Sequence, residues 1–290
     1  MALRFQQHPG LVVYLTAGDA GLAPKRNCGH GPDLSVTRKI ALAAIDAGAD
    51  VIELGVPFSD PLADGPVIQR ASERALARGT RLKDVLALAG ELRAARPNAG
   101  LVIFSYLNPI LRFGLTKFAD AAAEAGVDGV LLTDMIVEEA GDYLAEMERV
   151  NLAPIFLAAP TSPDERLQAI AAHSKGFIYA ISRTGITGKQ QNVAADAAAL
   201  VERIRRWTGP KDGAGWRGLP VAVGFGISNA DHVAEVAKFA DAAVIGSAIV
   251  ELIERTSLDH GEEQAPDAVA RFIQGLFIQG LRQPVEVHAL

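Results

Sequence analysis

The chain has 290 residues, of which 49% are hydrophobic and 21% charged, so it is long enough to bury roughly three quarters of its unfolded surface without disulfide or metal support. Its 28 basic and 34 acidic residues give a formal net charge of −6, which provides no overall attraction for nucleic acid or for an anionic membrane. The single cysteine, Cys28, excludes an internal disulfide and a multi-cysteine zinc or iron–sulfur site.

Short apolar runs alternate with helical patterns along the whole chain. The apolar runs predict strands at 11–16, 50–56, 101–106, 128–133, 153–158, 176–182, 220–224 and 241–246. They are rich in valine and isoleucine and mostly lack polar alternation, as expected of parallel strands that are buried on both faces. Amphipathic helices are predicted between them, as at 82–92. Two of these helices are predicted to begin at capping boxes, at Ser162–Glu165 and Ser228–Asp231.

Eight strand–helix units can close into a barrel or spread into a doubly wound sheet. The number of units favours closure, and no Gly-x-Gly-x-x-Gly motif follows the first strand, where a dinucleotide-binding sheet would carry it. We therefore predict a single (β/α)8 barrel domain over residues 1–290, with surface loops at 20–33 and 208–219. Cys28 and His30 lie in the first loop, but two candidate ligands without a second pair do not predict a metal site.

The location of the protein is predicted from segments that the sequence lacks. The amino terminus has no apolar run of the secretory type, and no stretch approaches the roughly 18 apolar residues of a membrane span. Together with the scarcity of thiols, this pattern predicts a cytoplasmic protein.

The second predicted strand places an acidic side chain inside the barrel. Strand periodicity puts Glu53 on the face opposite Ile52 and Leu54, so it points inward if those two residues pack on the helices. Loss of hydration there would raise the pKa of Glu53 toward neutrality, where a carboxyl can both donate and accept a proton. The alternative is a structural glutamate paired with an arginine, but no basic residue lies at an interior position of another predicted strand.

Three more carboxylates lie near predicted strand ends. Asp60 precedes a proline and is explained as a turn former. Asp64 precedes Gly-Pro and is explained either as a turn former or as the N-cap of the next helix. Asp134 ends the fourth strand. Side-chain chemistry alone leaves open which of them would work with Glu53.

Glycines follow the seventh and eighth strands, where many barrels bind phosphate. They lie in Gly224–Ser228 and Gly246–Ala248, where backbone N–H groups and a helix N-terminus would hold an anion. The alternative is that these glycines only allow tight turns. After the sixth strand, Gly185–Gly188 has the small residues of a loop that can cover a ligand, and Arg183 and Thr187 would add donors.

The positions of the histidines and lysines reduce the number of possible reaction types. No histidine lies at a predicted strand end, which argues against a metal-dependent epimerase. No lysine lies within a predicted strand, which argues against a Schiff-base aldolase. The remaining chemistry is metal-free acid–base catalysis by carboxylates on a phosphorylated small molecule.

The segment Glu53–Pro66, ELGVPFSDPLADGP, closely resembles the tryptophan synthase alpha subunit. The resemblance continues in the same order along the chain through Tyr106–Pro109, Ala153–Phe156, Ser182–Gly188, Gly224–Ser228 and Gly246–Val250. It implies a (β/α)8 barrel and the retro-aldol cleavage of indole-3-glycerol phosphate to indole and glyceraldehyde 3-phosphate, a step of tryptophan biosynthesis. The implied fold agrees with the independent count of units.

The resemblance also implies roles for individual residues. Glu53 would be the acid–base group, and Asp64 rather than Asp60 the second catalytic carboxylate. The substrate-binding residues that it implies are Tyr106, Asp134, Tyr179, Arg183 and Thr187. The phosphate-binding residues that it implies are Gly188, Gly224, Phe225, Gly226, Gly246 and Ser247.

A partner subunit follows from the same resemblance. Members of this family work in an α2β2 heterotetramer with a beta subunit, which holds pyridoxal phosphate and receives indole through a tunnel, so neither cofactor nor metal is expected in this chain. The loops after the second and third strands are expected to face that partner. Thr133–Ile136 departs from the family pattern, which has two prolines at this place.

Three alternative functions remain from the sequence. One is another phosphate-binding barrel, such as a sugar-phosphate isomerase or epimerase. The others are a non-catalytic subunit that only activates its partner, and a stand-alone lyase that releases free indole.

Overall fold

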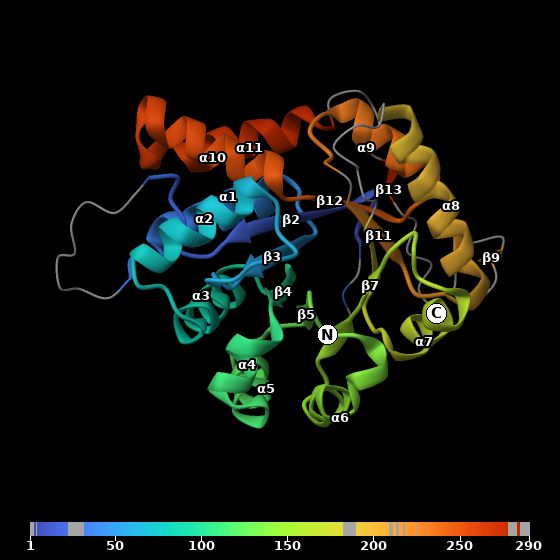
Figure 1. Cartoon of the computed structure of the whole chain (residues 1–290). Helices are drawn as coiled ribbons and strands as arrows, with labels where there is room; N and C mark the ends of the chain where they lie inside the picture. Colours follow the sequence, from blue (N-terminus) through green and yellow to red (C-terminus); the bar gives the residue numbers. More distant parts are fainter. Residues whose placement is uncertain are drawn as a thin grey trace.

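Parallel strands form a barrel inside a ring of helices in the computed structural model of the chain (Figure 1). The structure describes residues 3, 5–22, 32–181, 190–208, 211–212, 215–216, 218–224, 226–277 and 283–284. The barrel strands are β2 (Gly10–Thr16), β3 (Val51–Gly55), β4 (Gly100–Ser105), β5 (Gly129–Leu132), β6 (Ala153–Ile155), β7 (Leu157–Ala158), β8 (Ile178–Ile181), β11 (Val221–Gly224) and β12 (Ala242–Ile245).

The strand order is β6-β5-β4-β3-β2-β12-β11-β8-β7, and every neighbouring pair is parallel. Only Phe156 separates β6 from β7, the two ends of this order. They are two pieces of one bent strand, so the sheet closes on itself. The predicted strands and the predicted (β/α)8 barrel are confirmed, and the doubly wound alternative was wrong.

The helices lie on the outer side of the barrel, and α1, α10 and α11 pack together on one side of it (Figure 1). The helices are α1 (Ser35–Ala47), α2 (Pro66–Ala77), α3 (Leu82–Ala95), α4 (Leu107–Phe113), α5 (Leu115–Glu124), α6 (Gly141–Arg149), α7 (Asp164–His173), α8 (Gln190–Thr208), α9 (Ala230–Ala237), α10 (Ser247–His260) and α11 (Ala265–Gly275). Single 3-10 turns lie at η1 (Val137–Glu139) and η2 (Glu262–Gln264). Among the described residues, no helix is long and apolar enough to span a membrane.

Both predicted capping boxes were wrong by one residue. The N-cap of α7 is Pro163, and the Ser162 hydroxyl instead accepts a hydrogen bond from the Ala159 N–H at 3.1 Å. The N-cap of α9 is Asn229, whose side-chain oxygen accepts the His232 N–H at 2.9 Å. The N-cap is the residue whose carbonyl accepts the first hydrogen bond of the helix. Adjacent polar residues are equally good N-cap candidates in the sequence, so the sequence does not fix which of them has this position.

The two predicted surface loops contain more structure than expected. In the described part of 208–219, β9 (Lys211–Asp212) and β10 (Gly215–Trp216) pair in antiparallel fashion. Outside these two loops, another short antiparallel pair joins β1 (Gln7–His8) to β13 (Gln283–Pro284). Ala20 and Gly21, at the start of the other loop, are buried, whereas its Cys28 and His30 lie outside the described residues.

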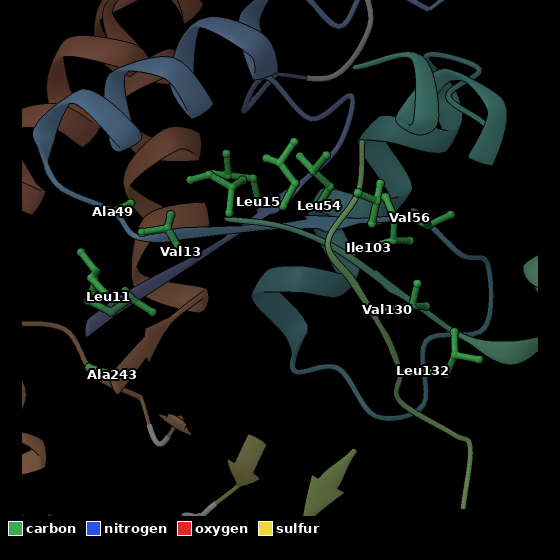
Figure 2. Close-up of a cluster of buried hydrophobic side chains, with 14 of the residues drawn as sticks. Leu11, Val13, Leu15, Ala49, Leu54, Val56, Ile103, Val130, Leu132 and Ala243 are labelled. Carbon is green, nitrogen blue, oxygen red and sulfur yellow. The ribbon is translucent and has the colours of Figure 1, made fainter. Parts of the chain in front are cut away.

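The main hydrophobic core lies between the barrel and the helices. Alternate residues of the strands supply it, among them Leu11, Val13 and Leu15 of β2 and Leu54 of β3 (Figure 2). A second cluster fills the barrel interior with the intervening residues, including Val51 of β3. This alternation turns Glu53 inward, as the strand periodicity predicted.

Aspartates that precede three strands hold the amino ends of neighbouring strands together. Asp50, Asp128 and Asp241 each accept a backbone N–H from the adjacent strand, at distances of 2.9, 2.9 and 2.7 Å. Asp128 also pairs with the Arg93 guanidinium at 2.5 Å. These contacts stabilise the end of the barrel opposite the candidate active site, which in such folds lies at the carboxyl ends of the strands.

Candidate active site

Glu53 lies in the middle of β3, with Tyr14 of β2 and Val102 of β4 as its neighbours in register. Its side chain is 0% exposed, and neither carboxyl oxygen has a hydrogen-bond partner among the described residues. Burial disfavours the charged form and raises the pKa of Glu53 to about 8. At neutral pH the barrel therefore holds a protonated acid, and no arginine pairs with it in the described part of the chain.

Asp64 and Asp60 differ sharply in environment, although both lie in the loop between β3 and α2. Asp64 is half-buried, and Oδ2 accepts a hydrogen bond from the Tyr106 hydroxyl at 3.2 Å. Burial raises its pKa to about 6, and the Tyr106 bond opposes that rise. Asp60 is exposed and accepts a bond from the Ser59 hydroxyl at 2.5 Å. The N-cap of α2 is Gly65, so Asp64 does not cap that helix.

Tyr106, just beyond β4, holds the loop that carries Asp64. Besides its bond to Asp64, the Tyr106 hydroxyl accepts the Ala63 N–H at 2.9 Å. Its ring packs on Phe58 with the ring centroids 5.1 Å apart. Burial and the charge of Asp64 raise the pKa of Tyr106 to about 12, so its hydroxyl remains a donor. In this structure Tyr106 orients a carboxylate, a role that the sequence did not predict.

Tyr179 of β8 reaches the same interior space from the opposite wall. Burial raises its pKa well above the ordinary value, and the charges of Glu53, Tyr14 and Asp64 act in the same direction. The Tyr179 hydroxyl lies 2.7 Å from the point that a Cβ on Gly224 would occupy. A side chain at Gly224 would therefore displace Tyr179 from the site.

The predicted phosphate-binding glycines lie at the carboxyl ends of the adjacent strands β11 and β12. Gly224 ends β11, Gly246 follows β12, and Ser247 is the first residue of α10. Gly226 has a φ of +70°, which favours glycine, and the space where its Cβ would lie is open. Backbone N–H groups beside an open space and a helix N-terminus form an arrangement that can hold a phosphate.

The remaining predicted residues differ in what the structure says of them. Asp134 is exposed, and its side chain accepts the Leu107 N–H at 2.7 Å at the start of α4. Arg183, Thr187, Gly188 and Phe225 lie outside the described residues. Within the described residues, no group of three or more His, Cys, Asp or Glu side chains is placed to hold a metal ion.

Tyr14 also belongs to this site, although no sequence motif marks it. It lies on the interior face of β2, next to Glu53 in register. The same two-residue periodicity that turned Glu53 inward would have found it, because it is the aromatic hydroxyl among the inward positions of the first strand.

Comparisons with known proteins point to one family. A family model described as tryptophan synthase alpha chain matches residues 1–276. The tryptophan synthase alpha chain of Solibacter usitatus is 46% identical over 255 residues, covering 88% of this chain and 87% of the relative. That of Methylococcus capsulatus is 43% identical over 267 residues and covers 92% of both chains.

Solved structures give the same result. A tryptophan synthase from M. tuberculosis in its aminoacrylate-bound form superposes with a TM-score of 0.74 at 33% identity, covering 93% of this chain and 94% of that chain. The tryptophan synthase subunit alpha from Legionella pneumophila superposes with a TM-score of 0.76 at 32% identity and 92% coverage of both chains.

Proposed function

This chain belongs to the tryptophan synthase alpha chain family, and we propose that Glu53 and Asp64 carry out its lyase reaction, the cleavage of indole-3-glycerol phosphate. The observation that carries this assignment is the buried Glu53, a carboxyl inside the barrel whose pKa is raised to about 8. Such a group is protonated at neutral pH and can act first as an acid and then as a base. The products would be indole and glyceraldehyde 3-phosphate.

The proposed reaction begins with protonation of the indole ring. Glu53 donates its proton to C3, which converts the ring into an indolenine cation that can accept electrons. The resulting Glu53 carboxylate then removes the proton of the glycerol hydroxyl next to the bond that breaks. As this carbon–carbon bond breaks, the hydroxyl carbon becomes the aldehyde and the bonding electrons return to the indole ring. Each proton transfer contributes roughly 10²–10⁴ in rate.

Asp64 has the complementary role of a fixed anion. It would lie near the indole N–H, where a negative charge stabilises the positive charge that develops on nitrogen. Because its pKa is about 6 and that of Glu53 about 8, a neutral acid and an anion coexist in the site between these values. Tyr106 supports the role through its hydrogen bond to Asp64.

The substrate phosphate would rest at the ends of β11 and β12. The proposed contacts are the N–H groups of Gly226, Gly246 and Ser247, supported by the open space at Gly226 and the N-terminus of α10. Gly224 would keep Tyr179 in place beside the substrate. The other proposed contacts come from Asp134, Arg183, Thr187, Gly188 and Phe225.

Two carboxylate substitutions test the assignment. Glu53→Gln should lower indole release at least about 10²-fold, since the amide supplies no proton, while substrate binding stays within about tenfold. Asp64→Asn should also impair release severely, and the exposed Asp60→Asn is the matched control from the same loop. Retained turnover in Glu53→Gln would refute its role. A larger loss in Asp60→Asn than in Asp64→Asn would reverse the choice between the two aspartates.

We further propose a beta subunit as partner, in an α2β2 assembly in which pyridoxal phosphate belongs to the beta subunit. Three exposed apolar side chains follow the adjacent strands β3, β4 and β5 and so lie on the rim around the site. They are Leu62, Leu111 and Ile136, with 94%, 55% and 43% of their surface exposed. Exposed apolar side chains on one rim are typical of a protein interface. The proposed location is the cytoplasm, in keeping with the single cysteine.

Indole release with and without a matching beta subunit tests the partnership. Slow release by the isolated chain that rises sharply with the beta subunit would support it. Fast release that the beta subunit leaves unchanged would favour a stand-alone lyase. No release in either case, together with turnover of a pentose phosphate, would favour a sugar-phosphate isomerase or epimerase.

A further inference from the structure

Tyr14 lies beside Glu53 inside the barrel. It pairs with Glu53 in the parallel register of β2 and β3, so both side chains leave adjacent strands on the interior face. Tyr14 is 5% exposed. Its ring meets Phe104 edge-on, with the centroids 5.0 Å apart and the planes at 73°. The packing fixes the ring beside Glu53, although no hydrogen bond joins these two side chains in the structure.

Two neighbouring residues determine the position of the Tyr14 hydroxyl. The Thr16 hydroxyl donates a hydrogen bond to Tyr14 Oη at 3.3 Å. A Cβ on Gly55 would lie 2.3 Å from the same oxygen, so the hydroxyl occupies space that only a glycine leaves free. Gly55 is two residues beyond Glu53 on the same face of β3, toward the strand end where the Asp64 loop begins. The hydroxyl thus lies beyond Glu53 along β3, on the side from which the Asp64 loop leaves the strand.

The titratable groups that act on the Tyr14 hydroxyl come from four places around the site. They are Glu53 of β3, Asp64 of the following loop, Tyr106 beyond β4 and Tyr179 of β8. Burial, followed by the negative charges of Asp64 and Glu53, raises the pKa of Tyr14 far above its ordinary value. Tyr14 therefore keeps its proton throughout the pH range of the reaction. Since Thr16 is the donor in their shared bond, the Tyr14 proton is available to another acceptor.

We propose that Tyr14 is a positioning residue: when Glu53 becomes a carboxylate, the unpartnered Glu53 side chain turns toward the fixed Tyr14 hydroxyl and accepts a hydrogen bond from it. The inference rests on the proposed function, in which Glu53 is ionised after it has protonated the indole ring. At that stage a buried carboxylate without a donor is unstable, and a hydrogen bond to the charged form favours it. Tyr14 loses no proton in this role. It lowers the proton affinity of Glu53 and holds the carboxylate for its second, basic step.

The substitution Tyr14→Phe removes the hydroxyl and keeps the ring that packs on Phe104. With the full chain labelled with ¹³C at the glutamate carboxyls, an NMR titration should show the Glu53 pKa rising by about one pH unit, a tenfold gain in proton affinity, which is typical for loss of a hydrogen bond to a charged group. In indole release, kcat should fall about tenfold while KM stays within about threefold. The alkaline limb of the pH profile should move upward with the Glu53 pKa.

A matched control and an isosteric variant make the test specific. Tyr143 is also buried, but its hydroxyl donates to the Val130 carbonyl at 2.8 Å, outside the barrel interior, so Tyr143→Phe should leave the Glu53 pKa and kcat unchanged. Replacing Tyr14 by 3-fluorotyrosine keeps the shape and makes the hydroxyl a stronger donor, so it should lower the Glu53 pKa.

Several outcomes would overturn the inference. They are an unchanged or lowered Glu53 pKa in Tyr14→Phe, no downward shift with 3-fluorotyrosine, or equal shifts in Tyr143→Phe. The titration needs no substrate, so its result is independent of the proposed reaction. If indole release depends on Glu53 but the titration shows no shift, only the role of Tyr14 fails. If the unsubstituted chain releases no indole, the proposed function fails whatever the titration shows.

Discussion

Glu53→Gln should stabilise the folded chain at neutral pH while it removes activity. The ordinary pKa of a glutamate is 4.5, and in the folded chain burial raises that of Glu53 to about 8. Between these values the unfolded chain releases a proton that the folded chain keeps, so the folded state becomes relatively less stable as the pH rises. The stability associated with the protonated carboxyl is complete below pH 4.5 and is lost as the pH rises through the folded pKa.

The magnitude follows from the distance between the two pKa values. Each pH unit between them corresponds to about 1.4 kcal/mol, so the loss reaches about 3 kcal/mol at pH 7 and approaches about 5 kcal/mol above pH 8. Glutamine has nearly the shape of the protonated carboxyl and does not ionise. The free energy of unfolding of Glu53→Gln should therefore exceed that of the unsubstituted chain by these amounts, and by less than about 1 kcal/mol at pH 5.

Urea unfolding of both proteins at pH 5, 6, 7 and 8 measures this difference directly. The control is Asp60→Asn, which removes an exposed carboxyl from the same region and should change the free energy of unfolding only slightly at pH 7. A Glu53→Gln variant that is less stable at pH 7, or whose advantage is the same at pH 5 and pH 7, would refute the argument that burial keeps Glu53 protonated.

Three further predictions concern the site and the frame that supports it. The rate of indole release should rise with pH near 6, as Asp64 ionises, and fall near 8, as Glu53 loses its proton. A rate that stays constant over this pH range would contradict the difference between the pKa values of the two carboxyls. Gly224→Ala should lower kcat at least about tenfold, because the alanine Cβ would lie 2.7 Å from the Tyr179 hydroxyl. Adding Tyr179→Phe should recover part of the loss, since the nearest remaining ring atoms are 3.2 Å from that Cβ. No recovery in kinetic assays of the double variant would mean that this contact is not the cause. Asp128→Ala should lower the free energy of unfolding by about 3–5 kcal/mol, because it breaks a buried ion pair and a strand-to-strand bond, while kcat stays unchanged; urea unfolding and indole release measure the two effects.

The order of strands and helices and the inward direction of Glu53 follow from the sequence alone. Both depend on local periodicity, which is set by backbone geometry and by burial of a strand on both faces. The strand at 153–158 was predicted as one element, and the break at Phe156 did not disturb closure of the barrel. Helix starts were less certain at the level of single residues, as at Ser162 and Ser228, because several adjacent polar residues carry the same capping signal.

Only the tertiary structure distinguishes the environments of Asp60 and Asp64. Side-chain chemistry left the two equivalent, and the family resemblance implied Asp64. The half-burial of Asp64 and its bond to Tyr106, 42 residues away in the chain, now support that choice. The place of the Tyr14 hydroxyl over Gly55 was likewise invisible in the sequence. The face of a strand to which a side chain points follows from its immediate neighbours in the sequence. Desolvation and hydrogen bonding depend instead on which distant segments pack together. The acid–base character of this site was therefore decided by the closed barrel.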